Sequence, residues 1–239
     1  MLIHDMTKER ATVEEVFDQT TRMIVFDLLN SGVLYELNGV VSSGKEARVY
    51  WGKNKKGTDL AVKIYLTSSA EFKKGMLKYI EGDPRFQGVK KDTRSLIAVW
   101  AQKEFRNLKE ASDAKVPVPK PIAVKSNVVV MEFIGKEGVS APSLKEDPPA
   151  NPERVYRLLV TYVKRLYQKA KLVHGDLSEY NIMLWKGRPV IFDVSQAVSL
   201  QHPMADFMLR RDLANLNRFF SRLNVKVYPV EELYKMVVG

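Results

Sequence analysis

A short polar motif in the second half of the chain limits its possible folds more than any other feature. Residues 174–181 read HGDLSEYN, in which Asp176 and Asn181 are separated by four positions. Beyond Asn181, the apolar run Val190–Phe192 leads directly into Asp193. A carboxylate at the end of a buried strand is desolvated unless it binds a cation. This pattern predicts that the fold brings these polar groups together at a site that holds a cation.

The spacing of this motif matches H-x-D-x-x-x-x-N, the catalytic loop of protein kinases. In that loop the aspartate accepts a proton from the substrate hydroxyl, and the asparagine binds Mg²⁺. The alternative is an aspartate-capped turn with a buried asparagine. Such a turn would not require Asp193, which stands where protein kinases carry the Mg²⁺-binding aspartate of their DFG motif. Asp176 is therefore the predicted catalytic base, and Asn181 and Asp193 are the predicted metal ligands.

A lysine in the first half of the chain is a further candidate residue of the kinase-like site. The segment AVKI places Lys63 where a kinase strand holds the α- and β-phosphates of ATP. A lysine among apolar strand residues is more often an exposed edge residue, so the functional interpretation needs an acidic partner on the following helix. In the segment WAQKEFRNL, Glu104 is the best candidate, and Glu110 lies nearer the helix end.

Two phosphate-loop templates compete in the segment before this strand. GVVSSGKE fits the G-x-x-x-x-G-K pattern, but Glu46 stands where a Ser or Thr should hold Mg²⁺, and a strand follows where a helix is required. The kinase glycine-rich loop, G-x-G-x-x-G-x-V, suits the context better. Its four marked positions are filled by Ser42, Gly44, Ala47 and Val49. An ordinary β-hairpin turn is the alternative.

The order of predicted elements is typical of an α+β fold with two kinase-like lobes. Hydrophobic periodicity and turn residues predict helices over 10–31, 69–80, 95–114 and 152–171, and strands over 34–41, 46–53, 59–66, 121–125 and 127–133. Thr12 and Glu15 would form a capping box for the first helix. A short hairpin and further helices complete the chain. Segment 82–94, rich in glycine and basic residues, is predicted to be a mobile surface loop.

Three regions follow from this order. Residues 1–33 would pack as a helix on the N-lobe, 34–134 would form the β-rich N-lobe, and 135–239 would form the hinge and a truncated C-lobe. Gly175 replaces the arginine of H-R-D, and DVS replaces DFG. No A-P-E motif follows, and 46 residues after Asp193 are too few for the usual peptide-binding helices. We therefore expect no activation loop and no peptide-docking platform.

Composition narrows the chemistry. The chain has no cysteine and three histidines, which disfavours thiolate and histidine-rich metal sites and favours Mg²⁺, with Mn²⁺ as the alternative, on oxygen ligands. The net charge of +10 indicates either a solvated basic surface or a polyanionic partner such as RNA. No segment has the roughly 18 apolar residues that span a bilayer. We expect a cytoplasmic protein without a membrane partner.

The chain resembles the RIO family of atypical serine/threonine kinases, and in particular its first subfamily, of archaeal type. The resemblance rests on SSGKEARV, AVKIY, WAQKEFRNL, MEFIG, HGDLSEYNIM and IFDVSQAV, and it covers about residues 10–239. It implies that Lys63 holds the ATP phosphates, and that Ser42 and the backbone near Gly44 cover the triphosphate. It also implies nucleotide-binding roles around the adenine for Met131 as gatekeeper, the Glu132 carbonyl and the Ile134 amide.

The resemblance further implies an autophosphorylating Mg-ATP-dependent kinase and ATPase that acts in maturation of the small ribosomal subunit. Thr93 and Ser95 are candidate phosphate acceptors in that case. An alternative is an ATPase-switched binding factor that forms a phospho-aspartate on Asp193 and has little kinase activity toward other proteins. A small-molecule phosphotransferase, which can carry a similar H-G-D motif, is disfavoured by the S-x-G-K-E-A and D-V-S-Q segments. The sequence does not name the protein substrate.

Overall fold

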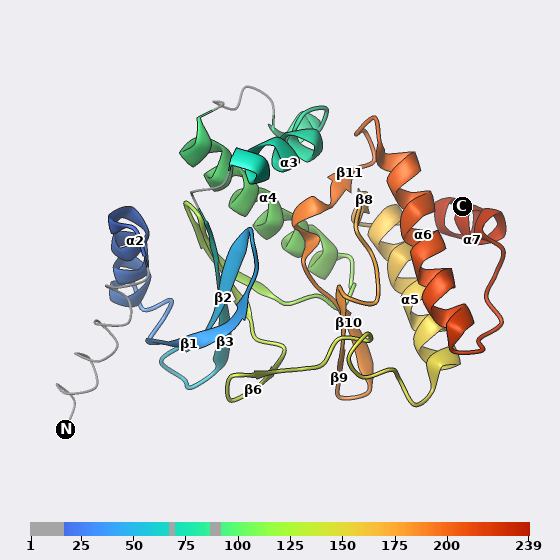
Figure 1. Cartoon of the computed structure of the whole chain (residues 1–239), viewed down its shortest axis with the longest axis horizontal. Coiled ribbons are helices and arrows are strands. Elements are labelled where there is room, and N and C mark those ends of the chain that lie inside the picture. The colour runs from blue at the N-terminus through green and yellow to red at the C-terminus, as the bar shows by residue number, and fades with distance from the viewer. Residues whose placement is uncertain (1–16, 67–69, 87–91) are drawn as a thin grey trace.

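A five-stranded antiparallel sheet organises the N-terminal half of the chain (Figure 1). The computed structural model describes residues 17–66, 70–86 and 92–239, and the side chains of 70–74 are not among them. The strands lie in the order β1-β2-β3-β5-β4. Their bounds are β1 (Glu36–Ser43), β2 (Ala47–Lys53), β3 (Asp59–Tyr65), β4 (Pro121–Lys125) and β5 (Val128–Glu132). The predicted strands are thus confirmed, with ends shifted by at most two residues.

Strand β3 lies in the middle of this sheet and is buried on both faces. Successive side chains of a strand point to opposite faces. One set packs with α2 (Gln19–Asn30), and the other set faces the second lobe. The first set is Leu60, Val62 and Ile64, and the second is Ala61, Lys63 and Tyr65. The edge-strand interpretation of Lys63 is therefore wrong, because the strand is central and the residue is only 8% exposed.

The helix predicted over 10–31 does not run continuously. Asp18 is extended, with φ −62° and ψ 157°, and its carboxylate accepts a hydrogen bond of 2.7 Å from the amide of Thr21. This capping interaction starts α2 at Gln19, because an N-cap residue satisfies an otherwise unpaired amide of the first turn. The proposed capping box of Thr12 and Glu15 lies outside the described residues.

The predicted loop 82–94 is shorter in the structure. The helix α3 (Ala70–Ile80) and the 3₁₀ turn η1 (Pro84–Phe86) precede the 21-residue helix α4 (Thr93–Asp113). Asp92 caps α4 by accepting a 2.9 Å hydrogen bond from the amide of Ser95, so Thr93 and Ser95 lie in the first helical turn. Residues 87–91 lie outside the described part of the chain.

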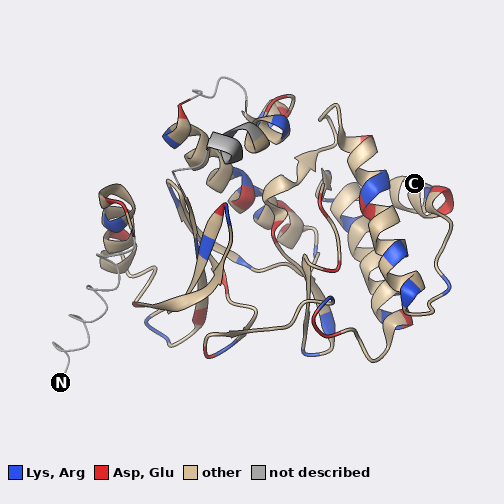
Figure 2. Ribbon diagram, in the orientation of Figure 1, with Lys and Arg blue, Asp and Glu red and all other residues tan. Residues whose placement is uncertain are grey.

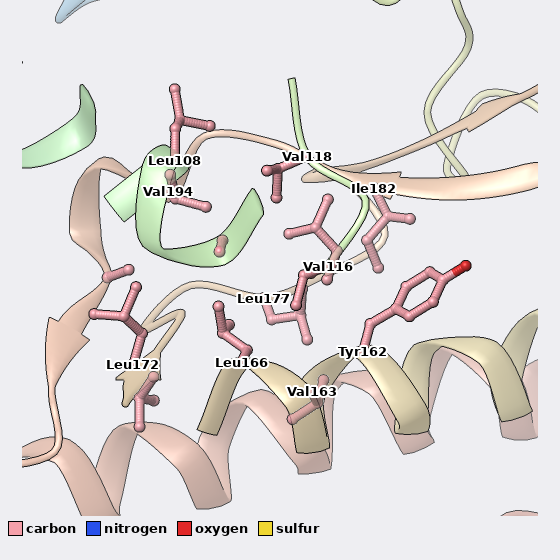
Figure 3. Packing of buried hydrophobic residues seen from close by; sticks show 14 of the residues in the cluster. Leu108, Val116, Val118, Tyr162, Val163, Leu166, Leu172, Leu177, Ile182 and Val194 are labelled. Carbon is pink, nitrogen blue, oxygen red and sulfur yellow. The ribbon is translucent and has the colours of Figure 1, made fainter. Parts of the chain in front are cut away.

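The C-terminal half is mostly helical and packs around the end of α4. Its remaining elements are β6 (Gly135–Lys136), β7 (Val139–Ser140), α5 (Pro152–Gln168), β8 (Leu172–Val173), β9 (Ile182–Trp185), β10 (Arg188–Ile191), η2 (Val194–Gln196), β11 (Val198–Ser199), α6 (Ala205–Arg222) and α7 (Val230–Val238). Figure 3 shows Leu108 of α4 beside Val194, above Leu166 of α5. Helix α4 is therefore shared by both halves. No described helix is long and apolar enough to cross a membrane.

Removing apolar volume from the α2 contact should destabilise the protein. Leu28 on α2 is 4% exposed, whereas Met23 on the same helix is 63% exposed. We expect Leu28→Ala to lower the free energy of unfolding by about 2–5 kcal/mol, because a buried cavity replaces packed methyl groups. The matched control Met23→Ala should change it by less than about 0.5 kcal/mol. Chemical denaturation measures both, and equal effects would contradict the packing of α2 on the sheet.

Candidate active site

A large pocket lies between the sheet and the C-terminal half. Its volume is about 630 Å³. Eight of the predicted site residues line it: Ser42, Gly44, Lys63, Glu104, Met131, Glu132, Ile134 and Asp193. Residues Asp176 and Asn181 do not line the pocket, but Asn181 is joined to its wall by the hydrogen bond from the Phe192 amide to the Asn181 carbonyl, 3.0 Å long. The fold therefore gathers the predicted residues at one place.

Lys63 connects the two halves of the site. Its Nζ donates to Glu104 Oε1 at 2.8 Å and to Asp193 Oδ1 at 2.9 Å. Glu104 is 1% exposed and also accepts, through Oε2, a 2.5 Å hydrogen bond from the hydroxyl of Tyr65. The choice of Glu104 over Glu110 as the partner of Lys63 agrees with this geometry, since Glu110 instead pairs with Arg85. The ammonium is thus fixed in place and keeps one N–H for a further acceptor.

The two carboxylates keep Lys63 charged. Burial alone would lower the pKa of Lys63, but the charges of Asp193 and Glu104 outweigh it and raise this pKa well above the ordinary lysine value. Burial likewise opposes ionisation of Asp193, and Lys63 and the Ser195 hydroxyl hold its pKa below the ordinary aspartate value. The Asp193 side chain is still 44% exposed. The site therefore presents an ionised, accessible carboxylate next to a fixed cation.

The loop that carries Asp176 is held by hydrogen bonds from several directions. Asn181 Nδ2 donates to the Asp176 carbonyl at 2.8 Å and to its carboxylate at 3.2 Å. Asp212 of α6, 1% exposed, accepts from the amides of Gly175 and Leu177 at 2.8 and 2.9 Å. Burial raises the pKa of Asp212 to about 7, against the lowering effect of these two amides. Helix α6 thus fixes the backbone on both sides of Asp176.

The local backbone explains why a glycine stands at position 175. Its φ is +79°, and a Cβ there would lie 3.1 Å from the Gln196 carbonyl. A side chain such as arginine would therefore be strained and crowded at this position. The departure from H-R-D follows from how closely this loop approaches the segment after Asp193.

His174 joins the same two segments. Its Nδ1 accepts from the Asp176 amide at 3.3 Å, so the Nε2 atom, 3.2 Å from the Phe192 carbonyl, carries the proton and donates. The ring is 1% exposed, and burial lowers the pKa of His174 below its ordinary value. It is therefore a neutral link between the Asp176 loop and the strand that ends at Asp193.

The turn between β1 and β2 forms another wall of the pocket. The Gly44 amide donates to the Ala47 carbonyl at 2.9 Å, which closes a turn between two antiparallel strands. A strand follows this turn where a helix would be required, so the alternative G-x-x-x-x-G-K interpretation is wrong. At the opposite end, Met131 pairs in register with Ala61, and the Ile134 amide has no backbone partner among the described residues. That amide can donate to a ligand.

Sequence comparison identifies the family of the chain. The RIO domain family model matches residues 48–233. The chain belongs to the RIO family. It is 44% identical over 233 residues to the human serine/threonine-protein kinase RIO1, covering 96% of this chain and 41% of the human protein. It is also 44% identical over 229 residues to the RIO-type kinase Rio1 of Methanocaldococcus jannaschii, covering 95% of this chain and 77% of that protein. The expected first-subfamily resemblance is confirmed.

A solved RIO structure has the same fold. The Rio2 kinase of Chaetomium thermophilum, in its ADP/Mg²⁺-phosphoaspartate complex, superimposes with a TM-score of 0.68 at 24% identity, over 92% of this chain and 66% of that one. The predicted two-lobed kinase-like α+β fold is confirmed. This RIO chain spans less than half the length of the human relative.

Sequence reasoning missed three buried side chains that contact the predicted site residues or the backbone beside them. Tyr65 could have been found, because strand alternation places it on the face of Lys63. Asp212 also had a signal, since it is an acidic residue on the apolar face of an amphipathic helix with Leu209 and Leu216. Lys103, whose ammonium donates to the Ser195 and Ala197 carbonyls just beyond Asp193, had no such signal, because a lysine beside Glu104 is expected at the helix surface.

The neutral His174 ring predicts a pH-dependent stability. The unfolded histidine has an ordinary pKa of about 6.5. Because the folded pKa is lower, this contribution is complete above about pH 6.5 and is lost as the pH falls toward the folded pKa, by up to about 1.4 kcal/mol per pH unit. Urea unfolding at pH 7.5 and 5.5 should show a larger loss for wild type than for His174→Gln. Equal losses of unfolding free energy in wild type and His174→Gln would contradict a contribution from the neutral His174 ring.

Proposed function

We propose that this RIO chain is a Mg-ATP-dependent atypical protein serine/threonine kinase and ATPase that autophosphorylates. The observation that carries the proposal is the Lys63 ammonium, held 2.8 Å from Glu104 and 2.9 Å from Asp193 in the inter-lobe pocket. A fixed cation beside an ionised carboxylate is the arrangement that phosphoryl transfer requires, since this chemistry depends on positioning and charge stabilisation.

The pocket offers complementary groups for each part of ATP. The Ile134 amide, without a backbone partner in the described part of the chain, and the Glu132 carbonyl would meet the adenine, with Met131 behind it. The turn around Ser42 and Gly44 would cover the triphosphate, because small residues let backbone amides approach phosphate oxygens. Lys63 would bind phosphate oxygens through its remaining N–H.

The oxygen groups suit Mg²⁺. Asn181 uses its amide nitrogen for Asp176, and its amide oxygen has no hydrogen-bond partner among the described residues. Asp193 contributes an ionised, partly exposed carboxylate. Across the described residues no cluster of three or more His, Cys, Asp or Glu can hold a metal alone. This fits Mg²⁺, which usually takes one or two protein ligands together with phosphates and water; Mn²⁺ accepts the same donors. The bound metal would neutralise charge on the phosphates.

Asp176 would accept the proton of an attacking hydroxyl in the kinase reaction. Its backbone is fixed by Asp212 through the flanking amides, and its carboxylate by Asn181. Thr93 and Ser95 are proposed acceptors for autophosphorylation. Both stand in the first turn of α4, where the helix dipole favours a phosphate group.

A phospho-aspartate ATPase cycle is the second candidate. It is favoured by the 44% exposed, ionised Asp193 carboxylate and by the state of the solved Rio2 structure, an ADP/Mg²⁺-phosphoaspartate complex. An Asp193 oxygen would attack the γ-phosphorus, the bond from phosphorus to the ADP oxygen would break, and ADP would leave. Water would then attack the phosphorus, release inorganic phosphate and restore the carboxylate.

Labelled ATP distinguishes the two reactions. Wild type, Asp176→Ala and Asp193→Ala are incubated with γ-labelled ATP and Mg²⁺, and protein-bound label and free phosphate are measured. Both variants should lose at least about 100-fold in turnover, as expected when a catalytic group is removed. Label that hydroxylamine removes, and that Asp193→Ala lacks, indicates an acyl phosphate. Hydroxylamine-stable label that depends on Asp176 indicates hydroxyl phosphorylation. Unchanged turnover in both variants would refute the proposed site.

We also propose a role in maturation of the small ribosomal subunit, with its RNA and proteins as partners. The net charge is +10, and Figure 2 shows basic residues recurring along α5 and α6. Among these, Arg154, Lys164, Arg218 and Arg222 are exposed. A basic surface of this kind attracts the phosphates of RNA.

Salt dependence tests the RNA partner. A labelled small-subunit ribosomal RNA fragment should bind, with affinity falling at least about tenfold between 50 and 200 mM salt, because released counterions drive such binding. The single variant Arg218→Glu should weaken binding and flatten the salt slope. Arg157→Glu, on an arginine already paired with Glu153, is the matched control. Absent or salt-independent binding would contradict the proposal.

A further inference from the structure

Two fully buried polar side chains of α4 reach across to the segment after Asp193. Lys103 and Asn107 are both 0% exposed and lie one helical turn apart. Lys103 Nζ donates to the Ser195 carbonyl at 2.8 Å and to the Ala197 carbonyl. Asn107 Nδ2 donates to the Val194 carbonyl at 2.8 Å and to that of Ala197 at 2.9 Å. One face of one helix therefore holds three carbonyls of the chain just beyond Asp193.

The Asn107 amide is held in the orientation that makes these bonds. Arg85 donates from Nη1 to Asn107 Oδ1 at 2.9 Å, so the Asn107 NH₂ must face the carbonyls. Arg85 is itself bound by Asp83, which is 2% exposed, and by Glu110. The donor therefore cannot flip without breaking an ion-paired contact.

Burial of Lys103 is costly for the fold. An ammonium taken from water needs compensation, and carbonyl oxygens compensate it less well than a carboxylate. Among the described residues Lys103 forms no ion pair within 4.0 Å. Burial, with the nearby charge of Arg85, lowers its pKa to about 7. Leucine or methionine would fill the same volume without this cost, so the donor itself has a use.

The segment that receives these bonds needs support. Asp193 has φ 54° and ψ 57°, a left-handed conformation that costs a residue with a Cβ roughly 1–2 kcal/mol. It persists only where surrounding contacts enforce it. Glu104, next to Lys103, fixes Lys63, which binds the Asp193 carboxylate. Helix α4 thus controls both the side chain of Asp193, through Lys63, and the backbone that follows it.

We propose that Lys103 and Asn107 are positioning residues that hold Asp193 in the conformation in which its carboxylate binds Mg²⁺. This inference rests on the proposed Mg-ATP function of the same site. Neither residue lines the pocket, so each acts through the backbone of residues 194–197. Their loss should weaken metal binding while leaving the metal-independent contacts of the nucleotide in place.

The test compares Lys103→Met with Lys109→Met, the same substitution at an exposed lysine of the same helix. Binding of the fluorescent nucleotide mant-ADP is titrated in EDTA and at increasing Mg²⁺, and ATP turnover is followed over the same Mg²⁺ range. We expect Lys103→Met to need at least about tenfold more Mg²⁺ for half-maximal effect, as for residues that orient metal ligands. Its mant-ADP affinity in EDTA should stay within about twofold of wild type, and Lys109→Met should match wild type throughout.

An unchanged Mg²⁺ requirement in Lys103→Met, with only a lower thermal unfolding temperature, would overturn the inference and leave a purely structural role. If Lys103→Met does not fold, Asn107→Asp carries the same test. It keeps the side-chain volume and the contact with Arg85, but turns a carboxylate oxygen toward two carbonyls. Wild type that binds mant-ADP in a Mg²⁺-dependent way without turnover would refute the proposed activity, and the binding titration would still decide this inference.

Discussion

The structure depends on a buried lysine held between two carboxylates. The Lys63 ammonium would be very costly inside the protein without partners, and Glu104 and Asp193 supply them from a helix and from the C-terminal half. Satisfying this one charge requires a central strand, the helix that crosses behind it and a loop more than a hundred residues later in the chain. The same requirement brings the lobes together around the pocket. The same contacts of Lys63 therefore stabilise the fold and assemble the site.

Helix α4 provides most of the contacts that hold the site together. It packs against the sheet, carries the partner of Lys63 and anchors the backbone beyond Asp193 through Lys103 and Asn107. Between Asp193 and α6, a stretch that the structure describes throughout, the chain forms only η2, β11 and short connections. This stretch is too short to hold a long segment that could rearrange Asp193. The site is accordingly assembled by packing and buried hydrogen bonds, with its Asp176 loop fixed by Asp212 from the other side.

The sequence was most informative where spacing and chemistry agreed. The strands were predictable because their turns and alternation are local signals, and the spacing of Asp176, Asn181 and Asp193 was enough to indicate one site. Prediction failed at the ends of segments, where Asp18 and Asp92 each start a helix later or earlier than hydrophobic periodicity suggests. A single hydrogen bond from an N-cap side chain sets where the helix begins, and hydrophobic periodicity carries no signal for that bond.

The sequence by itself determined the family and the order of elements, and it indicated the candidate site residues, because these follow from local pattern and residue type. Only the tertiary structure decided which groups meet. It placed Glu104, and not Glu110, beside Lys63, and it buried Lys63 in a central strand. It also showed that a side chain at position 175 would crowd the Gln196 carbonyl, and that Lys103 is a buried hydrogen-bond donor. Those outcomes depend on contacts between residues far apart in the chain, and such contacts are set by how the lobes pack.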